Sequence, residues 1–73
     1  MLVVRNENRP GLIGVVGTVL GRAGVNVSDM DVGKSPSGEA ALMVLATDEP
    51  VPPAVIEELR ASPGILQVQA VSD

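Results

Sequence analysis

The segment Ala40–Thr47, AALMVLAT, constrains the fold of this chain more than any other, because it is apolar at nearly every position. A short run that is apolar on both faces is typical of a strand in the middle of a sheet, with neighbours on either side. We therefore expect a central strand at these residues, and the rest of the chain must supply its partners.

Three further segments have strand character. Residues 2–4 are rich in β-branched side chains, residues 65–71 alternate, and a strand is predicted to begin at residues 25–27. In that strand the apolar phase changes, from odd positions at Val25 and Val27 to even positions at Met30 and Val32. Since a period of two does not tolerate such a change, we expect a bulge or twist near Ser28–Asp29.

Helical periodicity occurs twice. Pro10 and Gly11 are expected to open the first helix, and Gly24 to end it as a left-handed cap. At 100° per residue, one side of this helix collects Leu12, Val15, Val16, Val19, Leu20 and Ala23, with Ile13 at its edge. A shorter helix carries Val55, Ile56 and Leu59 on its apolar side and ends at Ser62-Pro63-Gly64.

The order strand, helix, strand, strand, helix, strand predicts an α+β fold for residues 1–73, in one domain. We expect the ferredoxin-like βαββαβ sandwich, a four-stranded antiparallel sheet with two helices on one face. The other face must then expose either Ala41, Met43 and Leu45 or Ala40, Leu42 and Val44. An exposed apolar face suggests a partner, and the alternative is ordinary surface hydrophobicity of a small domain.

Composition excludes several functions. The 73 residues contain no Cys, no His and no aromatic residue, and the net charge is -4. The commonest general base and metal ligand are therefore missing, no ring can stack on a base, and a nucleic-acid partner is not expected. No apolar run approaches the roughly 20 residues of a membrane span. We expect a cytoplasmic module with no catalytic residue and no metal site.

Known uses of this fold narrow the function further. A metal carrier would need Cys-x-x-Cys in the first loop, and an RNA-recognition domain would need aromatic residues on its strands. An acyl-phosphate hydrolase could use Arg9 with the N–H groups of the helix start, but no base or nucleophile is evident. Binding of a small ligand at the first loop is the function that these exclusions leave.

The start of the first helix is the predicted anion site. The N–H groups of Gly11, Leu12 and Ile13 have no helical partners and suit a carboxylate. Asn6 and Asn8 carry donors and acceptors that could bind an ammonium or a hydroxyl group. The alternatives are that the asparagines are loop or capping residues, that Arg9 is a solvated side chain, and that Asn26 is a turn residue.

Three glycines, Gly14, Gly17 and Gly21, fall within one narrow arc of the first helix, opposite its apolar side. Each costs about 1 kcal/mol relative to Ala. Close packing of this face against the same helix of a second copy would explain them, and the alternative is that they have no role.

The segment from Asn6 to Gly11, NENRPG, followed by Asn26 within GVNV, resembles the motif of ACT domains, and GEAALMVL and SPGI also resemble that family. The version it is most similar to is the C-terminal regulatory domain of D-3-phosphoglycerate dehydrogenases. The ACT domain of L-serine dehydratase β subunits has a very similar pattern.

The resemblance implies a regulatory amino-acid-binding domain. In the dehydrogenase family, two ACT domains pair through their second strands and first helices, and L-serine binds between them as the feedback inhibitor of its own synthesis. Carried over to this sequence, the ligand-binding residues are Asn6, Asn8, Pro10, Gly11, Leu12 and Ile13 from one copy and Asn26 from the other. The dimer interface includes Gly14, Gly17, Gly21 and Val27. Asn6 stands where well-studied members have His.

The resemblance also implies that this chain is not an enzyme by itself. We expect a fragment of an NAD-dependent D-3-phosphoglycerate dehydrogenase, with NAD and the catalytic domains elsewhere in the parent enzyme, or a free-standing ACT protein. An assembly module that responds to no ligand is the functional alternative.

Overall fold

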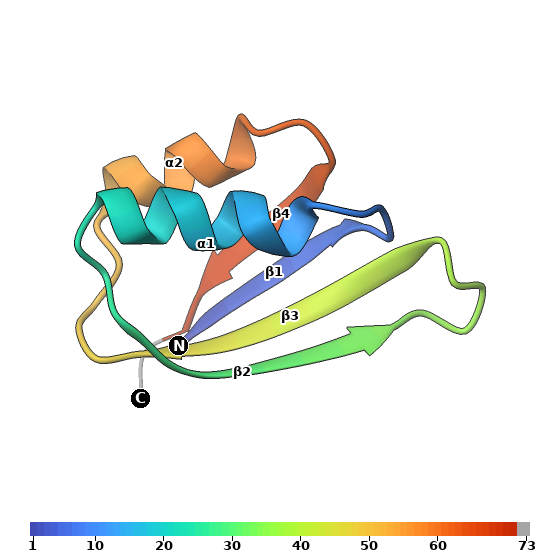
Figure 1. The fold of residues 1–73 in the computed structure, drawn as a ribbon, viewed down its shortest axis with the longest axis horizontal. Coiled ribbons are helices and arrows are strands. Elements are labelled where there is room, and N and C mark those ends of the chain that lie inside the picture. Colours follow the sequence, from blue (N-terminus) through green and yellow to red (C-terminus); the bar gives the residue numbers. More distant parts are fainter. Residues whose placement is uncertain (72–73) are drawn as a thin grey trace.

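The computed structural model describes residues 1–71 and has the predicted order of elements (Figure 1). Strand β1 spans Leu2–Glu7, helix α1 Leu12–Arg22, strand β2 Val27–Lys34, strand β3 Ala40–Thr47, helix α2 Pro53–Arg60 and strand β4 Ile65–Ala70. Both helices lie on the same face of the sheet. Neither helix within residues 1–71 is long and apolar enough to cross a membrane.

The four strands form one sheet in the order β2-β3-β1-β4, and every neighbouring pair is antiparallel. The ferredoxin-like α+β sandwich predicted from the sequence is therefore confirmed. Strand β3 has the predicted bounds and lies between β1 and β2, so it is a central strand. Strands β2 and β4 are the two edges.

The core lies between the sheet and the helices, and its buried hydrophobic side chains are aliphatic except for Met43. Leu2, Val4, Met43 and Leu45 point from the sheet toward the helices and are fully buried. Helix α1 contributes Leu12, Val16, Val19 and Leu20, and α2 contributes Val55 and Leu59. Burial of each such side chain favours folding by about 1.5–3 kcal/mol.

The open face of the sheet carries the alternate residues of β3. Leu42 is 43% exposed, and Ala40 and Val44 are half-buried, whereas Ala41, Met43 and Leu45 are buried. The register places Leu42 opposite Arg5 and Val44 opposite Val3, so the open face mixes apolar and charged side chains. Of the two sets left open by the sequence, Ala40, Leu42 and Val44 are thus the ones that face away from the helices.

The bulge expected near Ser28–Asp29 is present. Val27 pairs with Thr47, the register then shifts, and Asp29 pairs with Ala46. The extra residue changes the phase of β2, so that Met30 and Val32 lie opposite the inward-facing Leu45 and Met43. Strand β2 begins at Val27 rather than at Val25.

The first helix and first strand have different bounds from those predicted. Strand β1 continues through Asn6 and Glu7, because they pair with Ala41 and Ala40 at the start of β3. Helix α1 begins at Leu12, since Gly11 has a positive φ of 88° and is the N-cap. Pro10 therefore precedes the helix. Gly24, with φ 74°, is the left-handed residue after the helix, as predicted. Ala23 is exposed because the helix ends at Arg22.

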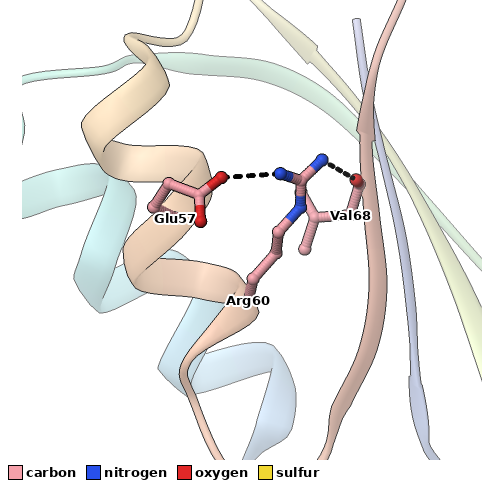
Figure 2. Close-up of polar contacts among 3 residues, drawn as sticks. All are labelled: Glu57, Arg60 and Val68. Carbon is pink, nitrogen blue, oxygen red and sulfur yellow. Dashed lines mark hydrogen bonds and ion pairs between the residues drawn. The ribbon is translucent and has the colours of Figure 1, made fainter.

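Arg60 ties the last turn of α2 to the edge strand β4 (Figure 2). Its Nη1 donates to Glu57 Oε1 at 2.6 Å, and its Nη2 donates to the carbonyl oxygen of Val68 at 3.1 Å. The guanidinium thus joins a helical ion pair to the backbone of the neighbouring strand. A cation in the last turn also interacts favourably with the helix dipole.

Candidate ligand-binding site

No side chain within residues 1–71 caps the N-terminus of α1. Gly11 adopts the left-handed conformation, and its carbonyl oxygen accepts the first helical hydrogen bond from the N–H of Val15 at 3.0 Å. The N–H groups of Gly11, Leu12 and Ile13 are left without a capping partner among the described residues. Such groups, at the positive end of the helix dipole, bind anions well. The Leu12 side chain is buried, so this residue offers only its backbone.

Two neighbouring turns hold the loop between β1 and α1. Asn8 Nδ2 donates to the carbonyl oxygen of Gly38 at 2.9 Å, and Asn8 N donates to that of Glu39 at 3.0 Å. On the other side, Glu7 N donates to the carbonyl oxygen of Gly64 at 2.8 Å. These bonds fix the backbone that presents the helix N-terminus, so the loop needs little ordering when a ligand binds.

Gly64 is a part of this region that the sequence analysis missed. In the sequence, Pro63-Gly64 marks the end of the second helix and belongs to the SPGI segment of the resemblance, whereas the structure packs Gly64 against the side chains of Arg9 and Leu12. The signal available was the Pro-Gly pair itself, which marks a turn but not what the turn touches. Arg9 forms an ion pair with Glu7 at 3.4 Å, and both side chains are about half exposed.

Asn6 is buried, with 3% of its surface exposed, although the sequence predicted it in a loop. Its Nδ2 donates to the carbonyl oxygen of Glu7 at 2.8 Å. Its Oδ1 is buried and has no hydrogen-bond partner within residues 1–71. An unpartnered buried acceptor costs about 1–3 kcal/mol, so it calls for a donor that the chain itself does not supply.

Asn26 lies at the opposite end of the sheet from this loop. It directly precedes β2, whose first residue pairs with the end of β3, whereas Asn6 and Glu7 pair with the start of β3. Figure 1 shows the two connections, β1 to α1 and α1 to β2, at opposite ends of the molecule. The predicted residues Asn6, Asn8 and Pro10 to Ile13 thus come together, and Asn26 does not join them within one chain.

The three predicted asparagines share one arrangement. Each donates its Nδ2 to an oxygen that only accepts: the carbonyl oxygens of Glu7 and Gly38 for Asn6 and Asn8, and the Asp48 carboxylate for Asn26. Each amide orientation is therefore set by its partner, and each Oδ1 is left as an acceptor within the described residues. Acceptors suit an ammonium or hydroxyl group, whereas the uncapped helix N-terminus suits a carboxylate.

The glycine face of α1 is open to solvent. Gly14, Gly17 and Gly21 are exposed, and a methyl group added at any of them would meet no atom of residues 1–71 within 4 Å beyond its own helix backbone and chain neighbours. The single chain thus gives no packing reason for these glycines. The dimer interface predicted at Gly14, Gly17, Gly21 and Val27 stays a prediction.

A hollow of about 530 Å³ in the described surface lies elsewhere. It is lined by residues near Thr47–Val51 and by Ala70 and Val71, and none of the predicted ligand-binding residues lines it. Asp48 lines this hollow, whereas the α1 N-terminus and the three asparagines do not. The candidate site is therefore the uncapped N-terminus of α1 with the asparagines.

Comparison with known proteins agrees with this fold and motif. Residues 1–64 match the family model of the ACT domain. The chain belongs to the ACT domain family.

Its relatives include D-3-phosphoglycerate dehydrogenases and an L-serine dehydratase β chain. A D-3-phosphoglycerate dehydrogenase of Archaeoglobus fulgidus is 39% identical over 96% of this chain, and one of Methanocaldococcus jannaschii is 35% identical over 99%. The chain spans 14% of the length of each. A probable L-serine dehydratase β chain of Bacillus subtilis is 34% identical over the whole chain, which spans 33% of that protein.

A solved structure agrees with the fold alone. The small subunit of acetolactate synthase from Thermotoga maritima superposes with a TM-score of 0.70 at 20% identity, over 97% of this chain and 45% of that subunit.

Proposed function

We propose that this chain is the regulatory ACT domain of a D-3-phosphoglycerate dehydrogenase, and that it binds L-serine, or a similarly small amino acid, between two copies. In this proposal the domain is part of a cytoplasmic NAD-dependent enzyme. Binding of the end product shifts the arrangement of the domains and lowers the activity of the catalytic domains. The shift can be no larger than the difference in serine affinity between the arrangements.

The observation that carries the proposal is the buried, unpartnered Oδ1 of Asn6, which lies a few residues before the uncapped N-terminus of α1 in the sequence. The Asn6 Oδ1 lacks a hydrogen-bond donor, and the N–H groups at the start of α1 lack an acceptor. A zwitterionic amino acid supplies both, since its carboxylate can accept from the N–H groups of Leu12 and Ile13 while its ammonium or hydroxyl donates to asparagine Oδ1 atoms.

The position of Asn26 supports a site shared between copies. Two copies could pair antiparallel through their β2 edges. The start of β2 in one copy, where Asn26 lies, would then be beside the end of β2 in the other copy, which is the end of the sheet that carries the β1–α1 loop. Strand β2 is an edge strand of eight residues, and its exposed Val32 suits such pairing. The open glycine face of α1 allows the first helices to approach.

Calorimetric titration with L-serine tests the proposal. We expect the wild-type chain to bind and the variants Asn8→Ala and Asn26→Ala each to lose most of the affinity. A mixture of the two variants should regain part of it, because a mixed pair has one intact site. Absence of binding by the wild type up to millimolar serine would refute serine sensing.

Two alternatives follow from specific observations. The match to an L-serine dehydratase β chain over the whole chain favours the same ligand in a different parent enzyme. The exposed β2 edge and glycine face would also serve an assembly module that responds to no amino acid. A dimer that does not bind serine, and whose removal leaves a smaller but active parent enzyme, would indicate the assembly module.

A further inference from the structure

Asp48 and Asn26 are joined by two hydrogen bonds. The N–H of Asp48 donates to the carbonyl oxygen of Asn26 at 3.0 Å. In return, Asn26 Nδ2 donates to Asp48 Oδ2 at 2.5 Å. One bond fixes the backbone of Asn26 and the other fixes its side chain, so Asp48 determines how Asn26 is presented.

The charge of Asp48 decides the orientation of the Asn26 amide. A carboxylate only accepts hydrogen bonds, so the amide must turn its NH₂ group toward Asp48 and its Oδ1 away. A neutral partner such as Asn could donate as well as accept, and would allow either orientation. The bond to an ionised acceptor is also stronger than one between neutral groups.

The surroundings hold the Asp48 backbone in place. The preceding residue, Thr47, pairs with Val27 in the β2–β3 ladder, and Thr47 Oγ1 donates to the carbonyl oxygen of Glu49 at 2.7 Å. Asn26 and Asp48 themselves are exposed. The pair is therefore an ordered polar group at the surface, available to a second copy, with a negative charge directly behind the amide.

We propose that Asp48 makes the ligand site selective for an amino group, as a positioning residue that acts through Asn26. This inference rests on the proposed function, in which Asn26 of one copy completes the site of another. The ligand carboxylate occupies the α1 N-terminus, and the Oδ1 of Asn26 accepts from the ligand ammonium. The negative charge of Asp48 then favours an ammonium over an uncharged hydroxyl at the same place.

The test compares L-serine with L-glycerate, which keeps the carboxylate and hydroxymethyl groups but has a hydroxyl in place of the ammonium. Both ligands are titrated into wild-type chain and into Asp48→Asn, which has nearly the same shape and no charge. We expect the substitution to weaken L-serine binding about tenfold and L-glycerate binding by roughly threefold at most. Glu49→Gln, which removes a neighbouring exposed charge, should change neither affinity by more than about twofold.

Salt dependence provides a second measurement that a purely structural role would not affect. Serine affinity of the wild type should fall with ionic strength more steeply than that of Asp48→Asn, since only the wild type has the charge to be screened. Equal losses for the two ligands would overturn the selectivity role, and so would an unchanged serine affinity. If the wild-type chain binds neither ligand, the proposed function itself fails, which distinguishes the two outcomes.

Discussion

Gly64 lies so close to Leu12 that a methyl group on its Cα would come within 2.9 Å of Leu12 Cδ2. Its φ of +89° is also in the region that side chains other than glycine rarely adopt. The turn after α2 thus packs against the first residue of α1 through a position where only a hydrogen fits.

Gly64→Ala should lower the free energy of unfolding by about 2–4 kcal/mol, because a positive φ and overpacking each carry a penalty. Gly38→Ala is the matched control, since Gly38 has φ +77° and nothing within 4 Å of the added methyl group. It should cost only about 1–2 kcal/mol. Urea unfolding measures both, and equal losses would contradict the close contact.

Leu42 and Met43 are adjacent residues on opposite faces of β3, with exposures of 43% and 0%. Met43→Ala should destabilise the chain by about 2–5 kcal/mol, because it leaves a cavity in the core. Leu42→Ala should cost less than about 1 kcal/mol in the single chain. Thermal unfolding at low protein concentration checks the pair. A large loss at Leu42 that grows with protein concentration would indicate that a second copy covers the open face.

Gly17→Ala should stabilise the isolated chain by about 1 kcal/mol, since the site is in the interior of α1 and the added methyl group meets open space. Gly24→Ala, just beyond the same helix, should instead destabilise it by about 1–2 kcal/mol, because Gly24 has φ +74°. Both substitutions add one methyl group to a glycine. Changes of opposite sign in the free energy of unfolding, measured with urea, would therefore isolate the effect of backbone conformation.

Gly14→Leu and Gly17→Leu should reduce self-association if the glycine face of α1 meets a second copy. Each adds a bulky side chain where two helix backbones would approach. Analytical ultracentrifugation gives the result directly, with Ala54→Leu on the exposed surface of α2 as control. Sedimentation identical to wild type for both glycine variants would exclude this interface.

Arg60→Met should lower stability by about 1 kcal/mol or less, since the guanidinium is half exposed and its ion pair is screened by solvent. Arg22→Met is a suitable control because Arg22 is the basic residue in the last turn of α1. Both variants lose the interaction with a helix dipole. The difference between them in chemical denaturation therefore reports the ion pair of Arg60 with Glu57 together with its bond to the Val68 carbonyl.

Periodicity predicted the fold because the spacing of apolar residues determines which side of a helix or strand is buried. The bounds of β3, the bulge after Val27 and the left-handed Gly24 followed from apolar phase and glycine placement. The extent of β1 did not follow, since Asn6 and Glu7 have weak strand propensity and belong to the strand through pairing with β3 and, for Asn6, also with β4. Regular alternation of residues 65–71 would place Leu66 on the same face as Val68, yet Leu66 is 54% exposed where the β1–β4 register shifts.

The candidate site was less predictable than the fold. Its residues could be chosen from the motif, but the burial of Asn6, the contact of Gly64 and the orientation of the Asn26 amide depend on segments distant in sequence. The Asn26–Asp48 bond joins residues 22 apart, and neither residue alone has a pattern that indicates the other. Such contacts follow from topology and register rather than from local spacing.

The pairing of Met1 with Val71 has a mechanical consequence. The two residues exchange hydrogen bonds of 3.1 Å and 2.9 Å and continue the antiparallel ladder of β1 and β4. A force that pulls these two residues apart acts across the strands and loads one hydrogen bond at a time, from Met1–Val71 inward. The domain should therefore unzip at low force when stretched between these points, although the same ladder, sheared along its length, would resist as a unit.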